Sequence, residues 1–109
     1  MATMAYSKTD FTQLDTTPTT GFFARLRAHV IQAGQNGVYV SVMLFNADEF
    51  EGATGSTDGN PFESANNVNG VNCTTTCPIT LPLPTAVATY EQAYMQKVVD
   101  TVHDLPNVL

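Results

Sequence analysis

Three carboxylates lie close together near the middle of the chain and could do acid–base or nucleophilic chemistry. Asp48, Glu49 and Glu51 follow directly after the apolar run of residues 38–45. Hydrolysis of a glycosidic bond needs two carboxyl groups on opposite sides of that bond, about 5 to 9.5 Å apart. These residues are therefore the candidate catalytic groups, and the alternative is that they are solvated charges of a loop.

Asparagine side chains in the same region could bind a substrate. An amide both donates and accepts hydrogen bonds, which suits it to sugar hydroxyls. Asparagine also builds turns and tolerates left-handed backbone, as the pair Asn69-Gly70 indicates. The candidate substrate-binding residues are Asn46, Asn60, Asn66, Asn67 and Asn69.

Other chemistries have less support in the sequence. Ser41 and Ser56 lack the G-x-S-x-G turn of a serine hydrolase. Cys73 and Cys77 have no histidine nearby to complete a zinc site, and the spacing of a calcium-binding loop is absent. We therefore expect no metal and no cofactor. A Cys73–Cys77 disulfide is compatible with an oxidising compartment.

The charge balance narrows the expected partners. Ten acidic and four basic residues give a net charge of −6 at pH 7. No basic stripe is available for phosphates, so nucleic acid is not an expected partner. The apolar run of residues 38–45 is far shorter than the roughly 20 residues that cross a bilayer, so no membrane partner is expected. Met1–Tyr6 has no secretory-signal pattern, which leaves the compartment open.

The first half of the chain predicts one helix and one strand. Four apolar residues recur at helical spacing: Phe23, Leu26, Val30 and Ala33. They predict a helix from about Phe22 to Ala33, which Gly34 and Gly37 end. Residues 38–45 are β-branched and aromatic, and they predict a strand buried on both faces, as in a parallel sheet covered by helices.

The second half predicts a long loop and another helix. Residues 46–84 have no sustained period and form the loop. Thr89 and Gln92 have the spacing of a capping box, so we expect the helix to start at Thr89 and to stop at Pro106. Its apolar face is Tyr90, Tyr94, Val98, Val102 and Leu105. Residues 107–109 follow as a strand onset, which makes the expected class α/β with parallel crossovers.

Several stretches together resemble the TIM-barrel glycoside-hydrolase-like proteins of the cellulase-type superfamily. The segments that carry the resemblance are 23–27, 37–45, 60–62, 66–70, 94–102 and 105–109, and they span about Phe22 to Leu109. The resemblance implies a partial (β/α)8 barrel made of helix 2, strand 3, a long loop and helix 3. Residues 1–21 are then a flexible N-terminal arm, and residues 22–109 are the barrel segment.

The resemblance also implies glycosidic-bond hydrolysis by an exported parent protein. In this family a Glu acid/base closes strand four and the nucleophilic Glu comes from a later strand, so both lie beyond Leu109. Relatives tend to have His where this chain has Asn60. We therefore expect a barrel fragment without its catalytic pair.

Two alternative functions stay open. One is a non-catalytic module that binds carbohydrate or associates with itself. The other is a minimal oligomeric hydrolase that uses the loop carboxylates. A lone strand leaves its edges open, so we expect the barrel fragment to self-associate as a homo-oligomer, with carbohydrate as a further possible ligand.

Overall fold

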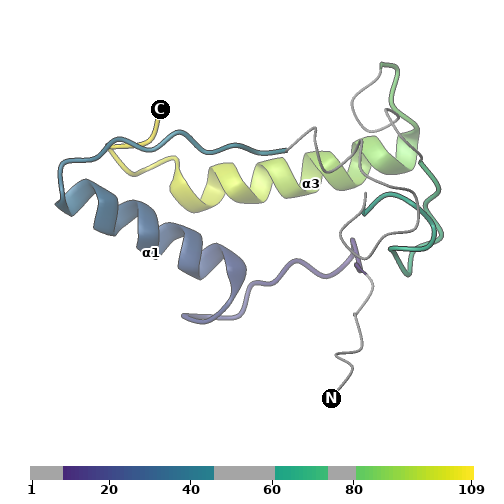
Figure 1. The fold of residues 1–109 in the computed structure, drawn as a ribbon, viewed down its shortest axis with the longest axis horizontal. Coiled ribbons are helices and arrows are strands. Elements are labelled where there is room, and N and C mark those ends of the chain that lie inside the picture. The colour runs from purple at the N-terminus through teal and green to yellow at the C-terminus, as the bar shows by residue number, and fades with distance from the viewer. Residues whose placement is uncertain (1–8, 46–60, 74–80) are drawn as a thin grey trace, which may run out of the picture. The chain divides into compact units, whose positions relative to one another are not determined.

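The computed structural model describes residues 9–45, 61–73 and 81–109. The chain divides into two compact units: residues 1–13 with 46–90 form unit 1, and residues 14–45 with 91–109 form unit 2. The described residues contain two helices, α1 (Phe22–Gln35) and α3 (Thr85–Val102), as Figure 1 shows. Helix α3 begins in unit 1 and ends in unit 2.

The expected α/β class is wrong, because the described residues form a small all-α arrangement with essentially no strand. They contain only two isolated parallel β-bridges, Thr9 with Asn67 and Val40 with Val108. A strand needs a ladder of hydrogen bonds along a neighbour. Residues 38–45 find such bonds at Val40 alone within the described chain, so they do not form a barrel strand.

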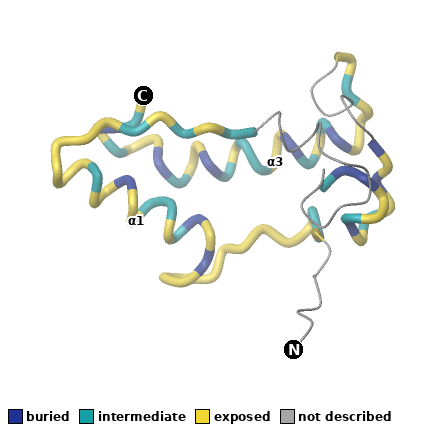
Figure 2. The backbone as a smooth tube through the Cα atoms, viewed as in Figure 1, coloured by how far each residue is buried: buried dark blue, intermediate teal, exposed yellow. Residues whose placement is uncertain are grey.

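The burial expected for residues 38–45 on both faces is also absent. Tyr39, Ser41 and Met43 are exposed, whereas the residues between them are partly buried (Figure 2). This alternation is the period of an extended chain with one face covered. The segment is therefore amphipathic in the structure, although its composition is almost wholly apolar.

Helix α1 begins at Phe22 as expected and ends two residues later than expected. Gly34 lies inside the last turn, and Gly37 supplies the left-handed residue after the helix, with φ of 73°. The Gly37 N–H donates to Gly34 O at 3.0 Å, and the Val38 N–H donates to Ala33 O at 2.9 Å. This pair of bonds is the Schellman arrangement, which closes the helix and turns the chain into the extended segment.

An aspartate before α1 stabilises its first turn. Gly21, at the N-cap, makes no side-chain bond to the helix. Asp15 instead accepts a hydrogen bond from the Phe22 N–H at 3.0 Å. Hydrogen bonds from the Thr17 side chain and from the Phe22 main chain hold the pKa of Asp15 below its ordinary value. A negative charge here also suits the positive end of the helix dipole.

Helix α3 begins at Thr85, four residues before the expected start. The Pro84 carbonyl accepts the bond from the Ala88 N–H at 3.0 Å, so the chain is already helical before Thr89. The Thr89 hydroxyl donates to Thr85 O at 2.9 Å, which is a bond within the helix rather than a cap. The expected capping box is therefore wrong. The buried residues of α3 are Val87, Glu91, Val98 and Val102.

Unit 2 is held by α1 packed beside the second part of α3, with both helices running in the same direction (Figure 1). Phe23 and Tyr94 have ring centroids 6.3 Å apart near the N-terminal end of this pair. Arg27 contacts Asp104 beyond the C-terminal end of α3, with N–O distances of 2.7 and 2.9 Å. The buried side chains Phe23, Val30, Val98 and Val102 form its apolar core.

Unit 1 is organised around an aromatic stack. Phe11 lies between Phe62 and Tyr90, with ring centroids 4.8 and 5.0 Å away. Phe62, Val71, Cys73 and Val87 are its buried apolar residues. Cys73 is disulfide-bonded; Cys77, the only other cysteine of the chain, lies outside the described residues.

The ion pair between Arg27 and Asp104 makes the stability of unit 2 depend on pH in the acidic range. The hydrogen bond from Arg27 lowers the pKa of Asp104 from 3.8 to about 2. Because the folded pKa is the lower one, this stabilisation is complete above the unfolded value and is lost as the pH falls from about 4 toward about 2. We expect Asp104→Asn to lower the melting temperature at pH 7 and to have little effect near pH 2.

The matched control is Asp100→Asn, which removes another acidic charge from the end of α3. Among the described residues, the Asp100 carboxylate accepts a bond from the Gln96 side chain alone, at 2.9 Å. Its replacement should change the melting temperature less at pH 7. Equal effects of the two substitutions at both pH values would show that the Arg27 pair does not stabilise the fold.

Candidate functional site

The candidate catalytic carboxylates Asp48, Glu49 and Glu51 lie outside the described residues, as do Asn46 and Asn60. Asn66, Asn67 and Asn69 are described, and all three belong to unit 1.

Asn67 lies inside its loop and binds main-chain groups there. Its side-chain amide donates to Glu63 O at 2.7 Å, to Val71 O at 2.9 Å and to Pro61 O at 3.2 Å. Its side-chain oxygen accepts from the N–H groups of Asn69 and Val71 at 3.1 and 3.0 Å. The residue is 3% exposed. The Asn67 carboxamide therefore organises the loop that carries it.

Asn69 and Asn66 connect this loop to the segment around Asp10. Asn69 accepts from the Phe11 N–H at 2.8 Å and donates to the Asp10 carboxylate at 3.2 Å. The Asn66 carbonyl accepts from the Thr9 N–H at 2.9 Å. The asparagine motif of residues 66–70 thus positions the aromatic stack of unit 1 by holding Phe11 in place.

The described residues include two buried carboxyl groups that are not among the candidate catalytic or substrate-binding residues. Glu63 is 4% exposed and Glu91 is 7% exposed. Burial raises the pKa of Glu91, because the charged carboxylate loses solvation. Glu63 belongs to unit 1 and Glu91 to unit 2, so neither unit contains a buried carboxyl pair among its described residues.

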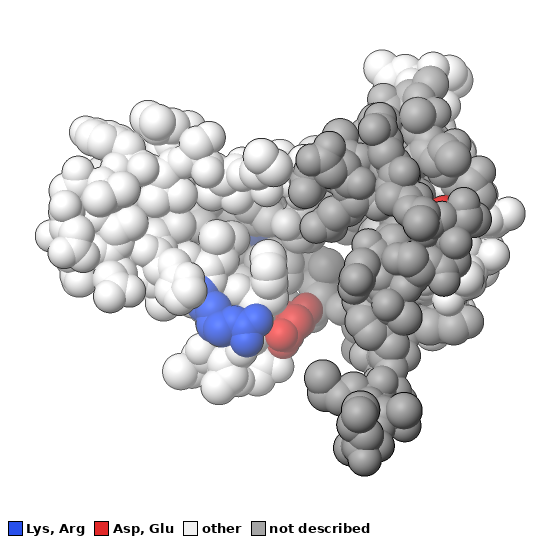
Figure 3. All heavy atoms as spheres, viewed as in Figure 1, with Lys and Arg blue, Asp and Glu red and all other residues white. Residues whose placement is uncertain are grey.

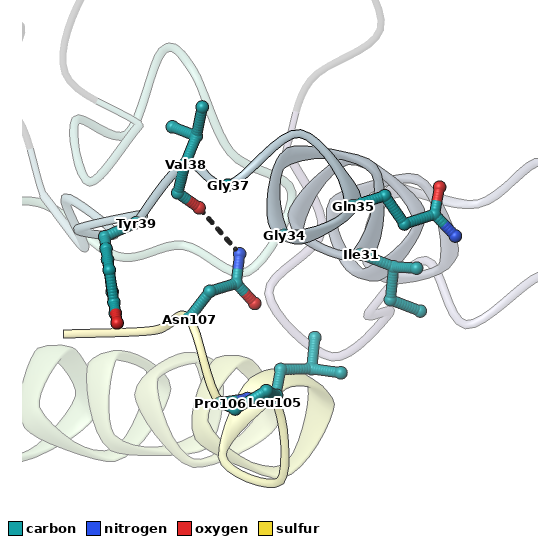
Figure 4. Close-up of a pocket in the computed structure, with 9 residues that line it drawn as sticks. All are labelled: Ile31, Gly34, Gln35, Gly37, Val38, Tyr39, Leu105, Pro106 and Asn107. Atoms are coloured by element: carbon teal, nitrogen blue, oxygen red, sulfur yellow. Dashed lines mark hydrogen bonds between the residues drawn. The ribbon is translucent and has the colours of Figure 1, made fainter.

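Unit 2 carries an open apolar groove of about 580 Å³. It lies between the last turn of α1, the start of the extended segment and the residues after α3 (Figure 4). Ile31, Val38, Tyr39, Leu105 and Pro106 are among its lining residues. This surface suits apolar side chains, because few polar groups line it.

Asn107 is one of the residues that line this groove. Its side-chain amide donates to Val30 O at 2.9 Å and to Val38 O at 3.1 Å, the second of which Figure 4 draws. A side chain at Gly34 would place its Cβ 3.0 Å from Cγ of Asn107. The glycine in the last turn of α1 thus leaves room for the asparagine that joins the helix to the extended segment.

One edge of the extended segment beside the groove carries main-chain groups without a partner among the described residues. Val40 donates to Asn107 O at 2.8 Å and accepts from the Leu109 N–H at 2.9 Å. Successive residues of an extended chain direct their main-chain groups to opposite edges. The groups of Tyr39 and Ser41 therefore face the other edge, where the described part of the chain offers them no hydrogen-bond partner.

The side chains along this segment differ in exposure. Tyr39 is 68% exposed and Met43 is 76% exposed. Phe45 packs against Tyr94 at a centroid distance of 5.6 Å. We call the main-chain groups of Tyr39, Ser41 and Met43, with their exposed side chains, the open edge.

Sequence reasoning predicted open strand edges, but it assigned both faces of residues 38–45 to a core and so missed the exposed face of this segment. The available signal was Ser41, the one polar residue in the run, which shares a face with Tyr39 and Met43. It also missed Asn107, whose position after Pro106 carries no recognisable pattern.

Comparison with known protein families, with curated proteins and with solved structures gave no match to this chain. Within the described ranges, no helix is both long and apolar enough to cross a membrane. Those same ranges contain no cluster of three histidine, cysteine or acidic residues that could hold a metal ion.

The role of Asn67 can be tested by replacing its amide with a carboxylate of nearly the same shape. Asn67→Asp loses the donors to three carbonyls and sets a negative charge against them. We expect unit 1 to be destabilised by about 2–4 kcal/mol, since buried unpaired groups cost roughly 1–3 kcal/mol each. Urea denaturation and hydrogen exchange of the Val71 amide measure the effect.

Asn72→Asp is the control, because Asn72 is an exposed asparagine close by in the same unit. It should leave the urea midpoint almost unchanged. If both variants unfold at the wild-type urea concentration, the hydrogen bonds of Asn67 do not hold the loop.

Proposed function

We propose that this chain is a self-associating interaction module, in which a second copy pairs with the open edge. One observation carries the proposal: the main-chain groups of Tyr39 and Ser41 face away from Val108 and meet no partner in the described residues. An extended segment with unpaired N–H and C=O groups is a template for pairing with another chain. Main-chain hydrogen bonds then supply affinity, and side chains on the paired faces supply specificity.

The exposed side chains favour the same function. Tyr39 and Met43 leave most of their surfaces in water. Covering apolar surface contributes about 25 cal/mol for each Å² removed from water. The groove next to Tyr39 extends this apolar surface beyond the segment itself. Pairing with a second copy would therefore shelter polar main-chain groups and apolar side chains in one event.

The hydrolase and carbohydrate hypotheses stay predictions. Five of their candidate residues lie outside the described residues: Asp48, Glu49, Glu51, Asn46 and Asn60. The other three, Asn66, Asn67 and Asn69, make hydrogen bonds within unit 1. Titration calorimetry with oligosaccharides separates them from self-association, since a sugar ligand would release heat at constant protein concentration. Turnover of a chromogenic glycoside, lost in amide variants of the carboxylates, would identify the minimal hydrolase.

Self-association can be tested by removing one donor of the open edge. Ser41→Pro deletes an N–H that faces away from Val108, so the bonds of Val40 to the C-terminal residues stay available. We expect wild-type protein to sediment as a concentration-dependent dimer, and the variant to dimerise at least about tenfold more weakly, a difference of about 1.4 kcal/mol. Analytical ultracentrifugation over a range of concentrations measures this.

Ser41→Ala is the matched control, because it removes the hydroxyl and keeps the N–H. It should dimerise like wild type.

Met43→Lys tests the same edge without a proline, by adding a charge to the exposed face, and should also weaken the dimer. A wild-type chain that stays monomeric at about 100 μM, where even a weak interface of micromolar affinity is occupied, would overturn the proposal.

A further inference from the structure

We infer that two copies pair antiparallel about Ser41, so that Tyr39 of each copy lies opposite Met43 of the other. This inference rests on the proposed self-association and adds the direction and the register of the contact. It follows from three features of unit 2: which residues face the open edge, which side chains are exposed, and where the charges lie.

The first feature limits the possible registers. Tyr39, Ser41 and Met43 face the open edge because Val40 between the first two faces Val108. In an antiparallel pair, residues that exchange both hydrogen bonds lie directly opposite each other. Residues of the open edge must therefore lie opposite residues of the open edge of the second copy.

The second feature selects one register among these. Centring the pair on Ser41 places Tyr39 opposite Met43 twice and Ser41 opposite Ser41. Centring it on Val42 instead places Met43 opposite Ser41, and Tyr39 opposite Phe45, which already contacts Tyr94 in its own chain. Only the register about Ser41 gives each large exposed side chain a large exposed partner. Thioether–aromatic contacts of this kind are favourable.

The exposed faces also select the direction. Two antiparallel copies are related by a twofold axis perpendicular to the plane of the two strands, and this axis keeps the Tyr39 and Met43 side chains of both copies on the same face of the pair. Two parallel copies would be related by a twofold axis that runs along the strands. That axis would put the side chains of the two copies on opposite faces, where they could not cover one another. Closed twofold contacts are the commonest arrangement of identical subunits.

The third feature allows two negatively charged chains to come together here. The chain has a net charge of −6, yet no Asp, Glu, Lys or Arg occurs between Arg27 and Asp48. Figure 3 shows that the surface at the C-terminal end of α1 is free of these charges on the face drawn. The residues of the open edge therefore bring no like charges of their own into a contact between two copies.

Cross-linking of single-cysteine variants tests this register. Cys73 is disulfide-bonded and does not compete for a thiol reagent. Residues directly opposite have Cβ atoms about 5 Å apart. Tyr39 and its own copy would be offset by roughly 13 Å along the strands. We therefore expect a short bismaleimide to join Ser41→Cys chains to each other, and Tyr39→Cys chains to Met43→Cys chains in a mixture of tagged and untagged protein.

Tyr39→Cys alone and Met43→Cys alone should cross-link no better than Gln32→Cys, an exposed position of α1 that reports random collisions. Sedimentation of each variant is measured in parallel. Cross-linking of Tyr39→Cys chains to each other would overturn the register and leave the self-association intact. Failure of Tyr39→Cys chains to cross-link to Met43→Cys chains, in protein that still dimerises, would do the same. Monomeric wild-type protein would overturn the proposed function as well.

Discussion

The described structure depends on asparagine side chains that pair main-chain groups left without a helix or a sheet. Buried N–H and C=O groups are costly unless they are hydrogen-bonded. Asn107 donates to Val30 O and Val38 O, and its own carbonyl accepts from Val40. One residue thus joins the end of α1, the extended segment and the C-terminal residues. Asn67 does the same for the loop of unit 1 through five side-chain hydrogen bonds.

The helices were the most predictable part of the fold, because their signals are local. The apolar period and Gly37 located α1 to within two residues of its observed end. The start of α3 was not found, since Thr89 has the residue type of a cap but lies inside the helix. The true first acceptor is the carbonyl of Pro84, and a main-chain acceptor requires no particular side chain.

The extended segment and the site were less predictable, because both depend on contacts distant in sequence. The composition of residues 38–45 expresses a preference for extended backbone, and the structure shows that backbone without a ladder. Whether such a segment forms a strand depends on a partner strand from elsewhere in the chain, and the residues of the segment itself do not show whether that partner is present. Asn67 could be identified as turn-building or sugar-binding from its type, but only its five bonds within the loop show what the amide does.

The open edge also lacks the features by which proteins keep exposed edges unpaired. Such edges usually carry lysine, proline, a bulge or an inward-pointing charge. Residues 38–45 contain no proline and no charged side chain. Ser41 is polar, but two serine hydroxyls that lie opposite each other can form a cross-strand hydrogen bond, whereas two lysines would repel each other. The one polar residue of the exposed face is therefore of a kind that permits pairing, and it lies midway between the two apolar residues that a partner would cover.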